Sequence, residues 1–376
     1  MPITGKKSNQ KGSKHLLIGS TQAHSGKSST ILGISQQLQA KGLEIAYIKP
    51  LGRCEHECTP NPIDEDVKFL SNVLHLPENR MGKSVLFLGS DIFEERLKET
   101  EELVDYCKSL QKSLEEMSGD IILMEGPATL EEGYLYQLSL PHIAQLVDAS
   151  VLLVARFESS EIVETLLSAK QRLGDRLIGV VINDIPHVQL DEANRLLKPF
   201  LEKKNIPVLA MLPQITFLGG VKVADLAERL NAQVLCRSDR LNLMVESLKI
   251  GAMNVNSALK YLSTGTNMAV VTGGGRTDIQ LAALETSTHC LIVTGNLRPS
   301  PIILHRAEEL EVPVLSVDLD TLTTVEIISK TLGQVRLHEP MKVESICQLF
   351  KEHFRFDRLL DSMNICLLYT SDAADD

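Results

Sequence analysis

Continuous apolar runs alternate with amphipathic segments along the first two thirds of the chain. A run that is apolar throughout, rather than at every second position, is typical of a parallel strand covered on both faces. The segments between the runs carry apolar residues at helical spacing, so the order of elements predicts an α/β fold with a doubly wound parallel sheet. The predicted strands are residues 15–20, 44–52, 120–128, 149–155, 177–183 and 207–213.

The same pattern predicts long helices and a second, smaller unit. Residues 91–117 read as one long, charged amphipathic helix, and residues 241–262 read as helical. Further apolar strands follow within residues 267–284, 289–296 and 312–320 and indicate a second α/β domain. We therefore expect three parts with secondary structure: a domain over 15–236, a domain over 239–340 and a C-terminal helical segment over 341–365.

The two ends of the chain are interpreted separately. Residues 1–14 are polar and basic and are expected to form a disordered lead-in. Residues 366–376 break from the preceding helical pattern and resemble the translation of a sequencing adaptor, so they are excluded from the prediction of the fold.

Composition and charge exclude several kinds of partner. The chain has 376 residues and a formal net charge of −11, and an acidic protein repels a phosphate backbone. It also has no tryptophan for stacking on bases. Both observations argue against a nucleic-acid surface. No run approaches the ~18 apolar residues of a membrane helix, and no signal peptide is recognisable. We expect a cytoplasmic protein with reduced cysteines. The clustered Cys54, His56 and Cys58 lack a second pair of metal ligands and are interpreted as a polar loop.

The first candidate site is the stretch "GSTQAHSGKSST", Gly19 to Thr30, between a predicted strand and a predicted helix. Gly26, Lys27 and Ser28 agree with a phosphate-binding loop, but Thr21 stands where that pattern has its first glycine. Such a loop holds polyphosphate with backbone N–H groups and a helix start, while the lysine reaches the terminal phosphates and the serine hydroxyl binds magnesium. The alternative is an ordinary strand-to-helix turn.

Polar residues at the carboxyl ends of other predicted strands extend this site, since ligands of a parallel sheet bind at that edge. Glu125 is the first candidate to bind magnesium together with Ser28, and Asp66 or Asp64 is the second. Lys49 is a candidate to stabilise an anionic acceptor or phosphate, so Lys27 and Lys49 are the candidate catalytic residues. The alternative for each is a strand-end cap or a surface polar group. The expected nucleotide contacts are Thr21, Ser25, Gly26, Lys27, Ser28, Ser29, Asn183 at the adenine, and Pro213.

Residues from about His15 to Cys236 resemble the dethiobiotin synthetase-like P-loop domain, which also occurs in long-form bacterial phosphate acetyltransferases. The resemblance rests on the loop above and on "YIKPLG", "LMEGP", "GVVIN" and "MLPQ". It implies a P-loop NTPase-type fold with Mg-ATP as cofactor, in a family whose phosphate loop often departs from the common spacing in its front half. The continuation "EGPATLEEG" differs from the glycine-rich one of dethiobiotin synthetases, because Pro127 removes a backbone donor.

Residues from about Asn242 to Glu339 resemble the DRTGG domain, the middle module of those acetyltransferases, through "LKIGAMNVNSALKYL" and "TGGGRTDIQLAAL". Two loops of this module, at 272–278 and 294–301, follow a strand and precede a helix. Backbone donors and arginines there could bind an anion; the alternative is that the glycines only make tight turns. The residues of this candidate second anion site are Gly274, Arg276, Thr294 and Arg298.

These observations lead to one functional hypothesis and two alternatives. The hypothesis is a regulatory or sensor protein that binds Mg-ATP and, by resemblance, modulates acetyl-phosphate metabolism through a partner enzyme, as a homo-oligomer. We expect no acetyl transfer, because a transferase domain of about 300 residues does not fit in the chain. The alternatives are an ATP-dependent ligase of the dethiobiotin or cobyrinic acid amide synthesis type, and a scaffold that has lost nucleotide binding. ATP hydrolysis is left open, because no catalytic base stands out.

Overall fold

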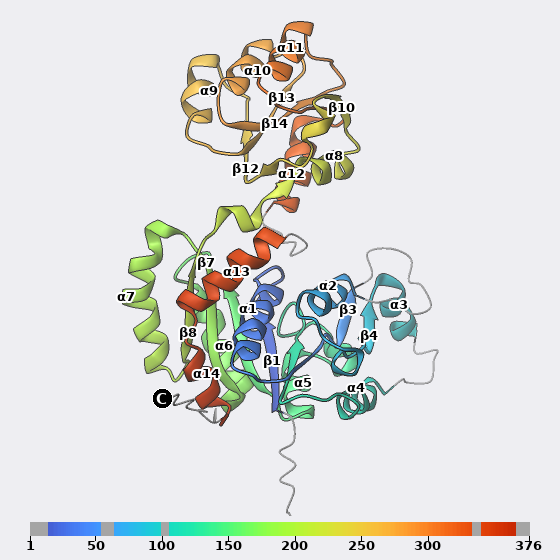
Figure 1. Ribbon diagram of the computed structural model, residues 1–376, viewed down its shortest axis with the longest axis vertical. Coiled ribbons are helices and arrows are strands. Elements are labelled where there is room, and N and C mark those ends of the chain that lie inside the picture. The colour runs from blue at the N-terminus through green and yellow to red at the C-terminus, as the bar shows by residue number, and fades with distance from the viewer. Residues whose placement is uncertain (1–13, 54–63, 99–104, 333–339, 366–376) are drawn as a thin grey trace, which may run out of the picture. The chain divides into compact units, whose positions relative to one another are not determined.

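The computed structural model describes residues 14–53, 64–98, 105–332 and 340–365, which form two compact units (Figure 1). Unit 1 comprises Met1–Gln214 and Leu337–Asp376, and unit 2 comprises Ile215–Arg336. Unit 2 is thus inserted in the sequence of unit 1. The predicted lead-in, the Cys54 to Cys58 cluster and the 366–376 tail lie outside the described residues, except for residue 14.

Unit 1 is built on a six-stranded parallel sheet with the strand order β2-β5-β1-β6-β7-β8. This sheet confirms the predicted doubly wound α/β class. Its strands are β1 Lys14–Ser20, β2 Ile45–Ile48, β5 Ile121–Glu125, β6 Ser150–Arg156, β7 Leu177–Ile185 and β8 Val208–Pro213. The segment 44–52 is two strands rather than one, because the chain leaves the large sheet at Lys49 and then forms β3 Leu51–Arg53, which pairs with β4 Leu86–Leu88.

Helices cover both faces of this sheet. The helices of unit 1 are α1 Lys27–Ala40, α2 Glu65–Val73, α3 Ser90–Lys98, α4 Tyr106–Glu115, α5 Leu140–Leu146, α6 Ile162–Leu173, α7 His187–Lys203, α13 Pro340–His353 and α14 Phe356–Ser362. Of these, α3 lies beside β4 and not over the large sheet (Figure 1). The prediction of one helix over 91–117 is wrong. Asp105 has non-helical dihedral angles, and its side chain accepts from the Lys108 N–H at 3.0 Å, so α4 begins with its own cap.

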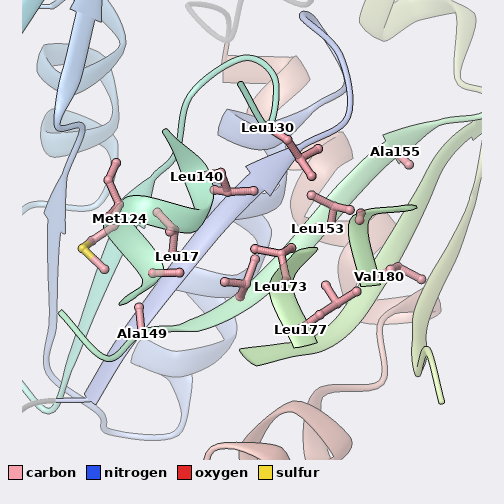
Figure 2. Close-up of a cluster of buried hydrophobic side chains, with 14 of the residues drawn as sticks. Leu17, Met124, Leu130, Leu140, Ala149, Leu153, Ala155, Leu173, Leu177 and Val180 are labelled. Carbon is pink, nitrogen blue, oxygen red and sulfur yellow. The ribbon is translucent and has the colours of Figure 1, made fainter. Parts of the chain in front are cut away.

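The core of unit 1 consists of aliphatic side chains from the central strands and the helices that cover them. Figure 2 shows Leu17 of β1, Leu153 of β6 and Val180 of β7 beside Leu140 and Leu173 from the covering helices. All are buried. Burial of each such side chain contributes about 1.5–3 kcal/mol. This packing fixes the strands in parallel register, so that their carboxyl ends meet at one edge.

The C-terminal helices α13 and α14 are part of unit 1. Phe350 of α13 is buried against Gly33 in the middle of α1, where a Cβ atom would overlap the phenyl ring. Arg358 of α14 donates to both carboxylate oxygens of Glu202 at 2.6 and 2.7 Å. The Arg355 N–H donates to the carbonyl of Leu209, a residue of β8, at 2.8 Å. The segment predicted over 341–365 is therefore helical and completes the first unit.

Unit 2 contains a five-stranded sheet with the order β10-β15-β14-β13-β12, parallel except for β10. Its strands are β10 Gln233–Cys236, β12 Ser247–Ile250, β13 Met268–Gly273, β14 Thr288–Thr294 and β15 Val314–Val317, with the small pair β9 Val221–Lys222 and β11 Met244–Val245. Its helices are α8 Val223–Arg229, α9 Val255–Leu262, α10 Thr277–Leu284, α11 Pro301–Glu309 and α12 Thr321–Thr331. This second α/β unit is also as predicted in class.

Two details of unit 2 differ from the sequence prediction. The segment 241–262 is helical only in α9, because β11 and β12 occupy its first half and β12 pairs with β13. The boundary between the units lies at Gln214, before the predicted end at residue 236, because β10 pairs with β15 in the second sheet. A four-residue strand at a sheet edge has too few residues to show which domain it joins.

Two further expectations concern the whole chain. Within the described ranges, no helix is long and apolar enough to cross a membrane. The described cysteines are free thiols, as expected from their scattered positions: Cys107, Cys236, Cys290 and Cys347.

Candidate functional site

The loop between β1 and α1 has the backbone that a phosphate loop needs. Gly26 has a φ of 102°, and a Cβ atom there would overlap the side-chain nitrogen of Asn183. The Gly26 carbonyl accepts from the Thr30 N–H and from the Thr30 hydroxyl, both at 2.9 Å, which starts α1 directly after the glycine. The Thr21 N–H donates to the Val154 carbonyl at 3.3 Å and joins the front of the loop to β6. Thr21, which stands where the phosphate-loop pattern has its first glycine, is therefore accommodated by a hydrogen bond from its backbone to β6.

Lys27 lies at the carboxyl end of β1. Its ammonium group donates to the Ser20 hydroxyl at 2.9 Å, and this hydroxyl donates to the Ala128 carbonyl at 2.8 Å. Ser20 is the last residue of β1, and Ala128 follows β5, the strand beside it. The lysine side chain thus folds back over its own loop to the sheet edge, where a bound anion would meet the start of α1.

The loop also contains a buried hydroxyl that fits a ligand. Ser25 is 1% exposed, and its Oγ has no hydrogen-bond partner among the described residues. A buried hydroxyl without a partner costs about 1–3 kcal/mol, which a phosphate oxygen would offset. The Ser25 carbonyl accepts from the Asn183 amide at 2.9 Å. Asn183, expected at adenine, therefore supports the loop with its side-chain nitrogen. Ser29 lies half-buried in the first turn of α1.

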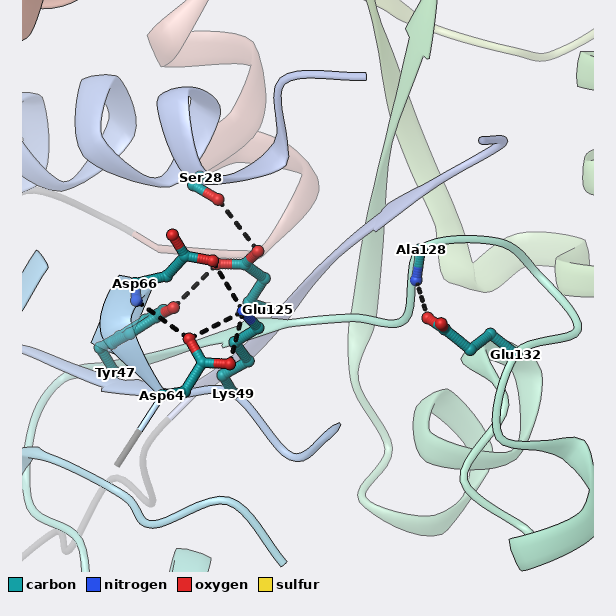
Figure 3. Close-up of polar contacts among 8 residues, drawn as sticks. All are labelled: Ser28, Tyr47, Lys49, Asp64, Asp66, Glu125, Ala128 and Glu132. Carbon is teal, nitrogen blue, oxygen red and sulfur yellow. Dashed lines mark hydrogen bonds and ion pairs between the residues drawn. The ribbon is translucent and has the colours of Figure 1, made fainter. Parts of the chain in front are cut away.

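Glu125 joins the loop to the neighbouring strands (Figure 3). The Ser28 hydroxyl donates to Oε1 of Glu125 at 3.0 Å, and the Tyr47 hydroxyl donates to Oε2 at 2.8 Å. Glu125 ends β5 and is paired with Ile18 of β1, so it reaches the first turn of α1 from the adjacent strand. The predicted proximity of Ser28 and Glu125 is thus present in the structure.

Lys49 forms the other half of this cluster. Its ammonium group lies 2.8 Å from Oδ2 of Asp64 and 2.7 Å from Oδ2 of Asp66. Asp64 also caps α2, since its side chain accepts from the Asp66 N–H at 3.0 Å. The start of α2 is therefore joined to the end of β2 through one lysine. Lys49, expected at an acceptor or phosphate, is paired with the two carboxylates considered for magnesium.

Burial and charge shift the titration of this cluster. Burial raises the pKa of Tyr47 well above its usual value, and the Glu125 carboxylate raises it further. Burial also raises the pKa of Glu125, although Lys49 acts against this shift. For Lys49, burial lowers the pKa, but Glu125, Asp66 and Asp64 outweigh it and the net pKa is raised. The cluster therefore keeps Tyr47 neutral and Lys49 charged at neutral pH.

We expect Lys49→Met to lower the stability of unit 1 by about 2 kcal/mol at pH 8, because buried carboxylates lose their counter-charge. The raised pKa of Lys49 means that its stabilisation is present below its unfolded pKa and is lost as the pH rises through its folded pKa. In the variant, protonation of Glu125, whose pKa burial raises, relieves part of the repulsion, so the difference from the unaltered protein should shrink towards pH 5. Urea unfolding at both pH values measures this, with Lys68→Met on the exposed face of α2 as control. Equal losses at pH 5 and pH 8 would contradict the assignment.

Other predicted residues are placed less directly. Pro213 ends β8, the outermost strand, three strands away from β1 in the sheet order. No group of three or more His, Cys, Asp or Glu side chains in the described part of the chain is arranged to hold a metal ion.

Two residues of the site, Ser20 and Tyr47, are not predicted by the sequence analysis. Ser20 is the polar last residue of a buried strand, which is the same signal that identified Glu125.

In unit 2, the four residues proposed for a second anion site have different surroundings. A Cβ atom on Gly274 would overlap Leu297. The Arg276 guanidinium donates to Asp278 at 3.0 Å and to the Met253 carbonyl at 2.7 Å. Thr294 is buried, and its hydroxyl lies 2.8 Å from that of Thr321. Arg298 is exposed in the loop after β14. Packing within the unit thus explains three of the four residues.

Comparison with known proteins supports the two-part organisation. The family profile described as AAA domain matches residues 14–222, and the profile described as DRTGG domain matches residues 225–331. The chain is 26% identical over 370 residues to a phosphate acetyltransferase of Nitratidesulfovibrio vulgaris, covering 91% of this chain and 50% of that protein. It is 24% identical over 368 residues to a phosphate acetyltransferase of Synechocystis, covering 92% and 51%. The chain thus spans about half the length of these relatives.

One solved structure with a partial match is an enzyme. A cobyrinic acid a,c-diamide synthase of Mycobacterium smegmatis, solved with bound ADP and magnesium, is 15% identical, with a TM-score of 0.34; the match covers 54% of this chain and 87% of that one.

Proposed function

Because the chain belongs to the AAA domain family over residues 14–222 and carries a DRTGG domain over residues 225–331, we propose that it is a regulatory protein whose unit 1 binds Mg-ATP. One observation carries the proposal: Lys27, Ser28 and Glu125 converge at the carboxyl edge of one parallel sheet, beside a glycine that tolerates no side chain. In this fold class, that edge is where nucleotides bind.

Each group at this edge has a role in the proposal. The start of α1 and Lys27 hold the phosphates, and the unpaired Ser25 hydroxyl provides a further donor. Ser28 and Glu125 hold the magnesium ion, which neutralises phosphate charge when it is bound. Asn183 keeps the loop in place through the Ser25 carbonyl. The fit of these residues to an anion with a divalent cation supports Mg-ATP as the ligand.

A sensor is favoured over a ligase by the surroundings of Lys49. An ATP-dependent ligase of the dethiobiotin type needs a cation for an anionic acceptor, whereas Lys49 is paired with Asp64 and Asp66. A lysine between two carboxylates has less attraction left for another anion. We therefore propose that nucleotide occupancy, rather than transfer to an acceptor, is the output of unit 1, and that a metabolic enzyme related to acetyl-phosphate chemistry reads it.

Calorimetric titration with ATP, with and without magnesium, tests the proposal. We expect magnesium to tighten ATP binding, and Ser28→Ala to remove most of this gain, about tenfold or ~1.4 kcal/mol, while binding in EDTA stays the same. The control is Ser109→Ala, on the exposed face of α4. Phosphate release is measured in the same samples. Rapid release stimulated by small carboxylates or amines would favour the ligase instead, and no binding by the unaltered chain would leave only the scaffold.

A further inference from the structure

We propose that unit 2 binds a small phosphate ester at the carboxyl edge of its own sheet, between the loops of residues 273–276 and 295–300. This site is separate from the nucleotide site of unit 1 and does not depend on it. The two loops follow the adjacent parallel strands β13 and β14 and precede α10 and α11. They are in direct contact, because Gly274 packs against Leu297.

Two glycines of the first loop have no structural explanation within the described residues. Gly273 and Gly275 lie outside the left-handed region, and a Cβ atom on either would have no neighbour within 4 Å. Neither backbone conformation nor packing therefore requires a glycine there. Glycine is also used where a ligand approaches the backbone closely. Gly274, between them, is fully explained by Leu297, so the open side of the loop is at Gly273 and Gly275.

A buried acceptor without a partner lies directly below this loop. Gln280 of α10 is 0% exposed, and its side-chain nitrogen donates to the carbonyls of Gly273 and Gly274 at 3.0 and 3.1 Å. Its Oε1 has no partner in the described part of the chain. An unpaired buried acceptor costs about 1–3 kcal/mol. Within this proposal, a hydroxyl of the ligand supplies the donor that this oxygen lacks and removes that cost.

The second loop offers an unpaired donor. Ser300 is the N-cap residue of α11, yet its side chain makes no cap hydrogen bond, and its buried Oγ has no partner within the described ranges. The serine N-cap normally bonds to the first turn of its helix. A hydroxyl left free at a helix start can instead donate to an anion that the helix dipole also attracts.

The charges at this edge favour one anionic group. Asp278 is paired with Arg276, and Asp320 caps α12 through the N–H groups of Leu322 and Thr323 at 2.8 and 3.1 Å. Arg298 and Asp318 are exposed in the loops after β14 and β15. These two loops are joined by the Gly295 N–H, which donates to the Leu319 carbonyl at 3.2 Å. Arg298 is thus the cation at this edge that can attract an anion, and the negative charge of Asp318 weakens that attraction.

The two unpaired groups define the class of ligand. The Ser300 hydroxyl and the helix starts suit a phosphate, while Oε1 of Gln280 needs a donor such as a hydroxyl. Inorganic phosphate satisfies only the first of these, and a neutral sugar satisfies only the second. A hydroxylated phosphate ester satisfies both, and ribose 5-phosphate and AMP are suitable probes of this class.

The test is calorimetry on the full chain in a Lys27→Ala background, in which the proposed site of unit 1 is expected to bind nucleotide about 100-fold more weakly. We expect saturable binding of ribose 5-phosphate or AMP, with inorganic phosphate and ribose each binding at least about tenfold more weakly. Gly275→Ala should leave the fold intact, because its Cβ meets nothing, and should weaken binding about tenfold by blocking the approach. Gly89→Ala, at another glycine with open space and no positive φ, is the matched control.

Charge variants provide a second measurement on the same site. Arg298→Ala should weaken ester binding and Asp318→Asn should strengthen it, each by a few fold, with unchanged melting temperatures. The proposal is overturned if neither ester binds in the Lys27→Ala chain. It is equally overturned if binding is the same in Gly275→Ala and Gly89→Ala, or if inorganic phosphate binds as tightly as the esters.

Discussion

Replacing Lys27 by alanine is expected to weaken ATP binding by about 100-fold, which corresponds to ~2.7 kcal/mol. The loss is large because hydrogen bonds from a charged group to phosphate contribute about 1.5–3 kcal/mol. The lysine is also held at the sheet edge by Ser20 before any ligand arrives. Little side-chain entropy is then lost on binding, so most of the interaction contributes to affinity. Calorimetry or equilibrium dialysis with ATP measures the change.

The matched control for this variant is Lys112→Ala. Lys112 is exposed on α4, 85 residues after Lys27 in the sequence. The Lys112→Ala variant should therefore bind ATP with the affinity of the unaltered protein. Circular dichroism and the melting temperature are measured for both variants, so that a loss of the fold is distinguished from a loss of affinity. Unchanged affinity of Lys27→Ala for ATP would refute nucleotide binding at this loop.

Much of unit 1 could be predicted from sequence because its strands are unusually clear. Central parallel strands are apolar throughout, so each one stands out, and the polar residue that ends it marks the edge where ligands bind. Glu125 is predicted in this way, whereas Lys27 and Ser28 are predicted from the phosphate-loop motif at the start of the next helix. From the sequence, Asp64 and Asp66 are considered only as magnesium ligands, and nothing predicts that they pair with Lys49, because they lie 15 and 17 residues away along the chain. The structure shows that both do.

The errors have local physical causes. The stretch before α9 contains short apolar runs whose period fits a helix as well as a strand, and only pairing of Leu248 with Ala269 of β13 decides between them. The predicted helix over 91–117 is interrupted within its length at Asp105, which caps a separate helix, α4. The expected role of Asn183 at adenine is not one of these errors and stays a prediction. Its contact with the Ser25 carbonyl has no signal in the sequence, because it depends on the positions of two segments 158 residues apart.

We expect Phe350→Ala to destabilise unit 1 by about 3–5 kcal/mol, the usual cost of removing a buried phenyl ring. Phe350 is 2% exposed and packs on α1, the helix that begins with Lys27. Hydrogen exchange resolved by peptide measures this without assuming that both units unfold together. Peptides from α1 and α13 should exchange at least about 100-fold faster, while those from unit 2 stay unchanged. Phe200→Ala on α7, where the ring is 41% exposed, should change exchange little. Unchanged protection of α1 in Phe350→Ala would contradict the packing.

A change at Gly33 distinguishes this contact from a general loss of core volume. Alanine normally stabilises a helix interior by about 0.5–1 kcal/mol relative to glycine. Here the added Cβ would overlap the Phe350 ring, so Gly33→Ala should destabilise unit 1 instead. In the Phe350→Ala background the ring is absent, and Gly33→Ala should regain its ordinary stabilising sign. A reversal of sign between the two backgrounds can arise only if the two residues meet, so this double-mutant cycle tests whether the C-terminal helices hold the helix that starts at the nucleotide loop.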